Sequence, residues 1–223
     1  MPLNIARHID HTLLKPDATR SDIEKLCHEA QKHGFYAVCI QPFWIATAKE
    51  LLSNSDVKVC TVIGFPLGGA TTKVKIHEAV DALALGADEL DVVMNIGTAL
   101  DHNWEYVDHE IRKIIEVAKG KCIKIIVETG LLSDVELRVA CEVIENAGAQ
   151  FIKTSTGFSK EGATIKAVKA IRSVVAQETG IKAAGGIRTL HDALEMIKAG
   201  ATRIGTSSGI DIVKAAESQQ DQN

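Results

Sequence analysis

The chain alternates short apolar segments, rich in β-branched residues, with longer segments whose apolar positions recur every three or four residues. The short segments predict buried strands, and the longer ones predict amphipathic helices. The predicted strands are 10–13, 37–40, 57–63, 89–93, 123–127, 151–153, 181–184 and 203–205. The predicted helices are 21–33, 44–52, 72–85, 104–118, 134–146, 163–175, 190–199 and 210–217. A strict alternation of strand and helix is typical of α/β proteins with a parallel sheet.

Local signals at the helix ends support this pattern. Ser21 is followed by Glu24, and Ser133 by Glu136. This Ser-x-x-Glu spacing predicts a capping box at the start of each helix. Glycines follow four of the predicted helices, where a left-handed residue commonly ends a helix: Gly34, Gly86, Gly148 and Gly200.

About eight strand–helix units in 223 residues predict a closed (β/α)8 TIM barrel, an α/β fold, as a single domain over residues 1–217. Three of the units share a Gly-Ala step between helix and strand, at 86–87, 148–149 and 200–201. An open doubly wound sheet is the alternative, because closure of a sheet leaves no mark on the sequence. Residues 218–223 are polar and are expected to form a frayed tail.

Composition and charge narrow the possible functions. Hydrophobic residues make up 46% of the chain and charged residues 24%, and the net charge is −4. These values are ordinary for a globular protein and favour neither nucleic acid nor a membrane as partner. The five cysteines contain no Cys-x-x-Cys pair, so we expect reduced thiols in a cytoplasmic protein. We found no signal peptide, no apolar run of membrane length and no histidine spacing typical of a metal site, so no metal is expected.

One lysine stands out as a candidate nucleophile. Lys153 ends a short apolar strand and is followed by Thr-Ser-Thr-Gly. Lys182 holds a matching position near the end of the predicted strand 181–184. Burial and a second ammonium group both favour the neutral amine form of a lysine, which attacks carbonyl carbons. Each lysine alone could equally be a strand-end residue that reaches solvent.

A carboxylate and a thiol are expected near these lysines. Asp91 shares a strand face with Glu89 and Val93, and an inward orientation would bring it to both lysines. Taken alone, Asp91 could be a structural acid. Cys39 ends the strand 37–40 and could face the same mouth, although a small buried thiol is the simpler interpretation.

Two later loops are candidate phosphate-binding segments. One carries Gly185, Gly186 and Arg188, and the other carries Gly205, Ser207 and Ser208. Glycines let backbone amides approach an anion, and a helix N-terminus favours negative charge. These loops follow the last two predicted strands, where barrels commonly bind phosphate.

Motifs along nearly the whole chain resemble those of the deoxyribose-phosphate aldolase family. The most specific are Lys-Thr-Ser-Thr-Gly at 153–157 and Lys-Ala-Ala-Gly-Gly-Ile-Arg at 182–188. The others lie at 9–14, 38–40, 62–66, 91–95 and 205–208. The resemblance implies reversible cleavage of 2-deoxy-D-ribose 5-phosphate to acetaldehyde and D-glyceraldehyde 3-phosphate, in deoxyribonucleotide catabolism.

The resemblance also implies roles for individual residues. Lys153 would form a Schiff base with the substrate, and Asp91 and Lys182 would relay protons. The two glycine-rich loops would hold the phosphate, and further substrate contacts would come from Asp10, Thr12, Cys39, Thr156 and Gly157. No cofactor or metal is implied. The partners implied are a sugar phosphate, an aldehyde and further copies of the chain, as a homodimer or homotetramer.

Two positions differ from some family members. Phe158 stands where some carry a lysine near the phosphate, and the chain ends in Gln222-Asn223 where some end in a tyrosine that assists proton transfer. Three alternatives share the predicted fold. They are another Schiff-base aldolase or transaldolase, a phosphosugar isomerase or epimerase that uses Asp91 without covalent chemistry, and a catalytically silent phosphate-binding barrel.

Overall fold

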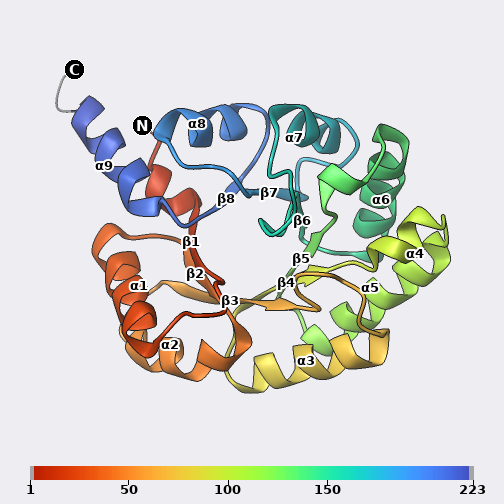
Figure 1. Ribbon diagram of the computed structural model, residues 1–223, viewed down its shortest axis with the longest axis horizontal. Helices are drawn as coiled ribbons and strands as arrows, with labels where there is room; N and C mark the ends of the chain where they lie inside the picture. Colours follow the sequence, from red (N-terminus) through yellow and green to blue (C-terminus); the bar gives the residue numbers. More distant parts are fainter. Residues whose placement is uncertain (1–2, 221–223) are drawn as a thin grey trace.

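Eight parallel strands close into a barrel in the computed structural model, which describes residues 3–220. The strands pair in chain order and β8 returns to β1, where Asp10 lies opposite Gly205. Seen down the barrel, the strands form the centre and the helices form a ring outside them (Figure 1). The strands are β1 Ile9–Leu13, β2 Ala37–Ile40, β3 Lys58–Ile63, β4 Glu89–Val93, β5 Cys122–Ile126, β6 Phe151–Lys153, β7 Gly180–Ala184 and β8 Arg203–Thr206.

The α-helices between the strands cover the outside of the barrel (Figure 1). They are α1 Arg20–His33, α2 Ile45–Leu51, α3 Thr72–Ala84, α4 Ile96–Leu100, α5 Trp104–Ala118, α6 Asp134–Ala147, α7 Ile165–Arg172, α8 Leu190–Lys198 and α9 Gly209–Gln220. Three short 3-10 helices are η1 Ile5–His8, η2 Pro42–Trp44 and η3 Thr129–Leu131. No helix among residues 3–220 is long and apolar enough to cross a membrane.

The closed barrel confirms the predicted fold and excludes the open sheet. Each predicted strand is present, with ends that differ by at most one residue. The predicted helix 44–52 is divided into η2 and α2, and α7 is shorter than its predicted range 163–175. The sequence pattern did not reveal η1, α4 or η3, which are too short to show a helical period. Helix α9 continues through residues 218–220, which the sequence analysis assigned to a polar tail. Residues 221–223, including Gln222 and Asn223, lie outside the described residues.

Helix capping follows the prediction at α6 but not at α1. Ser133 and Glu136 form the predicted capping box. The prediction of Ser21 as the cap of α1 is wrong, because Thr19 holds that position: its hydroxyl accepts a hydrogen bond from the Asp22 amide at 3.3 Å. The Asp22 carboxylate accepts the reciprocal bond from the Thr19 amide at 2.8 Å. An equally good cap two residues earlier extends the helix by one residue. The four predicted glycines all have positive φ after their helices.

The inner and outer faces of the strands carry different chemistry. On β5, Ile123 and Ile125 belong to the apolar core, whereas Lys124 between them contacts the carboxylates of Glu89 and Asp91. Strand alternation therefore places apolar side chains against the helices and charged ones inside the barrel. The charged interior lies below the C-terminal mouth, where the substrates of TIM barrels bind.

Candidate active site

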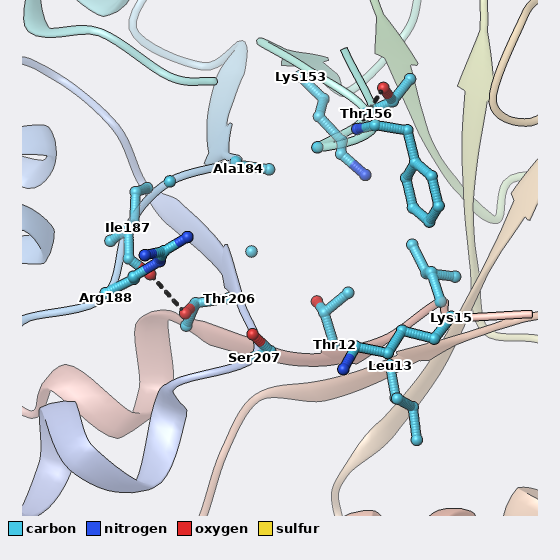
Figure 2. A pocket seen from close by; sticks show the side chains of 16 residues that line it. Thr12, Leu13, Lys15, Lys153, Thr156, Ala184, Ile187, Arg188, Thr206 and Ser207 are labelled. Atoms are coloured by element: carbon cyan, nitrogen blue, oxygen red, sulfur yellow. Dashed lines mark hydrogen bonds between the residues drawn. The ribbon is translucent and has the colours of Figure 1, made fainter. Parts of the chain in front are cut away.

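A cavity of about 370 Å³ opens at the C-terminal ends of the strands. Its wall comes from the loops after β1, β6, β7 and β8, and Figure 2 shows the side chains that line it. The lining residues are Thr12, Leu13, Leu14, Lys15, Lys153, Thr156, Gly157, Phe158, Ala184, Gly185, Gly186, Ile187, Arg188, Gly205, Thr206 and Ser207. Nine residues predicted to bind or react with substrate are among them.

Lys153 lies at the base of this cavity. It ends β6, and its side chain is only 2% exposed. Its ammonium nitrogen Nζ lies 2.8 Å from Oδ2 of Asp91. A substrate in the cavity can therefore reach this nitrogen, whereas bulk solvent has little access to it.

Lys182 lies directly beside Lys153. The two residues are partners in the β6–β7 register, and Lys182 Nζ lies 2.7 Å from the same Oδ2 of Asp91. Oδ2 of Asp10 is 2.5 Å away on the other side of Lys182. Although complete burial favours its neutral form, the carboxylates of Asp10 and Asp91 raise the pKa of Lys182 well above its usual value. Lys182 is therefore protonated in the resting site, beside the candidate nucleophile.

Asp91 joins three lysines. Besides Lys153 and Lys182, its Oδ1 accepts a hydrogen bond from Lys124 Nζ at 2.8 Å. Burial alone would raise the pKa of this carboxyl group, but the lysines, Lys124 most strongly, lower it well below the usual value. Asp91 is therefore ionised throughout the neutral pH range.

The remaining members of the cluster are Glu89, Asp10 and Arg203. Lys124 Nζ lies 2.7 Å from Glu89, and Arg203 bridges Asp10 at 2.8 Å and Glu89 at 3.1 Å. We refer to these seven side chains as the inner charged cluster: Asp10, Glu89, Asp91, Lys124, Lys153, Lys182 and Arg203. It holds three carboxylates and four basic groups. The sequence analysis did not propose Lys124 or Arg203 as site residues. Lys124 could have been found, because it lies within the apolar run 122–126 just as Lys182 lies within an apolar strand.

The predicted phosphate loops lie on one side of the cavity. Gly185 and Gly186 follow β7, both with positive φ. Ser207 follows β8 just before α9 (Figure 2). Gly205 allows a close approach, because a Cβ atom there would lie 3.0 Å from the Lys182 side chain. The loops thus bring Gly185, Gly186 and Ser207 to the open space that Arg188 also lines.

Five predicted residues do not line the cavity. Asp91 and Lys182 lie beneath it, and so does Asp10, which is fully buried between Lys182 and Arg203. Cys39 is also fully buried, with its sulfur 3.9 Å from Asp91. Ser208 is half-buried, and its amide donates to the Thr206 hydroxyl at 2.9 Å. Asp10 therefore belongs to the inner charged cluster and Cys39 contacts it, and neither faces the open space.

Glu128 is a further buried residue that sequence reasoning did not identify. Its Oε2 accepts hydrogen bonds from the amide of Thr156, at 3.2 Å, and from the Thr156 hydroxyl. The Thr156 hydroxyl in turn accepts a bond from the amide of Phe158 at 3.1 Å. Glu128 therefore holds the segment that follows the candidate nucleophile.

Two groups of potential metal ligands lie in the barrel interior. The donor atoms of Cys39, Cys60 and Asp91 lie within 4.8 Å of one another, as do those of Asp10, Cys60 and Glu89. Lys124 Nζ already lies 3.3 Å from the Cys60 sulfur, 2.8 Å from Asp91 and 2.7 Å from Glu89. A lysine ammonium thus occupies the position at which a cation would bind, so these groups do not fit a metal ion.

Comparison with known proteins gives a consistent result. Residues 5–215 match the model of the DeoC/LacD family of aldolases. A deoxyribose-phosphate aldolase of Thermococcus kodakarensis is 55% identical over 95% of this chain and 96% of its own. Deoxyribose-phosphate aldolase 1 of Bacillus licheniformis is 51% identical over 99% of this chain and all of its own. Among solved structures, the tetrameric deoxyribose phosphate aldolase of Aeropyrum pernix has a TM-score of 0.90 at 38% identity, with 96% of this chain and 92% of that chain covered.

Proposed function

Because the chain belongs to the DeoC/LacD aldolase family, we propose that it cleaves 2-deoxy-D-ribose 5-phosphate reversibly to acetaldehyde and D-glyceraldehyde 3-phosphate, with Lys153 as the Schiff-base nucleophile. The observation that supports this assignment most directly is the position of the lysine. Lys153 is the member of the inner charged cluster that lines the cavity, and a fixed cation lies next to it.

The proposed reaction requires Lys153 as a free amine, and the other charges of the cluster balance without it. Burial of unbalanced charge is costly. The cluster has three carboxylates, and Lys124, Lys182 and Arg203 remain protonated because ion pairs with those carboxylates raise their pKa despite burial. The cluster is therefore neutral when Lys153 is a free amine. A free amine is the form that attacks a carbonyl carbon.

The reaction then proceeds through this amine. The Lys153 nitrogen attacks C1 of the open-chain sugar, and loss of water gives a protonated imine. The C2–C3 bond breaks, its electrons form the enamine, and the C3 hydroxyl loses its proton as D-glyceraldehyde 3-phosphate leaves. Protonation of the enamine at C2 and hydrolysis release acetaldehyde and restore Lys153.

Asp91 and Lys182 supply the proton transfers in this scheme. Their side chains lie 2.7 Å apart and both neighbour the reacting nitrogen. Imine formation adds a permanent positive charge beside them, which makes it easier for the pair to release a proton. The same pair accepts the proton of the C3 hydroxyl, so Asp91 and Lys182 together serve as both the acid and the base of the reaction.

The phosphate of the substrate binds at the loops after β7 and β8. The amides near Gly185 and Gly186, the Ser207 hydroxyl and the N-terminal end of α9 surround one end of the cavity. Binding of the phosphate, distant from the bond that breaks, orients C1 toward Lys153. Thr156 and Gly157 line the space between these two positions, and Thr12 lies opposite.

We also propose that the chain acts in the cytoplasm, as a homodimer or homotetramer. All five cysteines are free thiols, as expected in a reducing compartment. Exposed apolar side chains on the outer helices, such as Val135 on α6, offer surface for association.

Reductive trapping tests the covalent step. Incubation with acetaldehyde and borohydride should attach an ethyl group to one lysine, and peptide mass mapping should locate it at Lys153. Lys153→Arg should show neither the adduct nor turnover while it remains folded, because a guanidinium does not lose its proton at neutral pH. Cleavage of the substrate by wild-type protein without a trapped lysine would contradict the Schiff-base assignment and would favour non-covalent chemistry.

A further inference from the structure

The lining of the cavity has an unbalanced charge. Its basic side chains are Lys15, Lys153 and Arg188, and none of its lining residues is acidic. Lys153 lies 2.8 Å from the Asp91 carboxylate beneath it and is the proposed nucleophile. Lys15 and Arg188 have no carboxylate within 4.0 Å among residues 3–220, so both are available to an anion in the cavity.

Lys15 approaches the cavity from a separate part of the fold. It lies in the loop between β1 and α1, whereas Arg188 lies in the loop between β7 and α8. In Figure 2 the two side chains stand on opposite sides of the hollow, with Ser207 and Thr12 between them. An anion held at the Ser207 side thus has one cation on each flank.

The other walls of the cavity supply no further cation. Phe158 follows Gly157 on the β6 side, and its ring packs edge to face on Phe65 with centroids 5.2 Å apart. Leu13 and Leu14 line the β1 side next to Lys15. The mouth therefore combines apolar walls with two cations that form no ion pair within 4.0 Å in the described part of the chain.

We propose that Lys15 is a specificity-determining residue that contacts the phosphate ester of the substrate from the side opposite Arg188. This inference rests on the proposed function, because it takes the sugar phosphate as the ligand. A charged hydrogen bond to phosphate adds binding energy for phosphorylated sugars and none for neutral ones. Lys15 therefore distinguishes the two kinds of sugar while contributing nothing to the bond that breaks.

Kinetics with two substrates tests this role. Lys15→Gln should lower kcat/KM for 2-deoxyribose 5-phosphate about tenfold to a hundredfold, mainly through KM, as expected for loss of a hydrogen bond to a charged group. The same variant should cleave unphosphorylated 2-deoxyribose like the wild type. Lys15→Arg, which keeps the charge, should restore most of the lost activity. Lys25→Gln is the matched control, because Lys25 is an exposed lysine on α1 outside the cavity lining.

Calorimetric titration with inorganic phosphate tests the contact without turnover. Phosphate should bind Lys15→Gln about tenfold more weakly than it binds the wild type or Lys25→Gln. An unchanged Kd, or an equal loss of activity with both sugars, would overturn the role of Lys15. If the wild type bound phosphate through Lys15 but released no acetaldehyde from either sugar, the proposed function would fail and the anion contact would stand.

Discussion

Lys124 offers a sharp test of the inner charged cluster, because it is fully buried and holds two carboxylates. Its Nζ lies 2.7 Å from Glu89 and 2.8 Å from Asp91. Lys124→Met keeps the approximate length of the side chain but removes its charge. In this variant Glu89 still pairs with Arg203, and Asp91 still pairs with Lys153 and Lys182. The cluster then has three carboxylates and three basic groups, and the proposed reaction needs one of these basic groups, Lys153, to be neutral.

The expected loss is large. Removal of one member of a buried ion pair costs about 3–5 kcal/mol, because the partner stays buried with its charge less compensated. For a protein of this size, each kcal/mol lowers the melting temperature by about 2–4 °C. Lys124→Met should therefore melt about 6–20 °C below the wild type. Because Lys124 contributes most to the lowered pKa of Asp91, that pKa should rise in the variant.

Differential scanning calorimetry across pH measures both effects. Lys121→Met is the matched control: Lys121 lies three residues earlier, its side chain is 50% exposed, and its carboxylate partner Asp88 is 4.0 Å away. An exposed pair of this kind contributes about 0–1 kcal/mol. Adding Glu89→Gln to Lys124→Met should recover part of the lost stability, since it removes a buried charge as well. If Lys124→Met melted no lower than Lys121→Met, the ion pairs of the inner charged cluster would not stabilise the fold by the amount expected.

Three further outcomes are expected. Lys182→Leu should lower kcat at pH 7 and move the pH–rate profile to higher pH, because it removes the positive charge that favours a neutral Lys153. An unmoved profile would contradict the coupling of the two lysines. Ser207→Asp should raise KM for 2-deoxyribose 5-phosphate far more than for 2-deoxyribose, since a second anion repels the phosphate, and equal effects would place the phosphate elsewhere. The folded-state pKa of Asp91 is lowered, so its stabilising effect should be complete above the ordinary aspartate pKa of about 3.9. That effect should decline as the pH falls below this value, and an acid-unfolding curve of Asp91→Asn should lack this component.

Much of the architecture follows from local sequence alone. Each strand is a short apolar run that must be buried, each helix has an apolar face that must cover the sheet, and glycine ends four helices where a left-handed residue is needed. These are short-range requirements, so the number and order of the strands, and their ends to within one residue, could be predicted. Lys153 could also be singled out as a candidate nucleophile, since its position at the end of a buried strand is a local property.

Other features depend on contacts between residues far apart in the sequence, which local sequence patterns do not predict. The choice of Thr19 over Ser21 as the cap of α1 depends on how the β1–α1 loop enters the helix. The positions of Asp10 and Cys39 below the cavity depend on how far the inner layers of the barrel extend toward its mouth. Glu128 contacts Thr156, which lies 28 positions later in the sequence. The contact requires a left-handed backbone at Glu128, with φ of 54°, and the flanking residues do not predict that conformation.

The sequence alone singled out Lys153, Lys182 and Asp91 as candidate reactive groups, because a lysine or carboxylate within an apolar strand is costly to bury without a partner. Only the tertiary structure decided which partners these are: closure of the barrel brings strands β1, β4, β5, β6, β7 and β8 together, and their inner side chains share a small volume shielded from water. Electrostatic energy in such a volume depends on separations of a few ångströms between residues up to 193 positions apart. That dependence is why the strands could be predicted singly, while the ion pairs of the inner charged cluster are a property of the closed barrel.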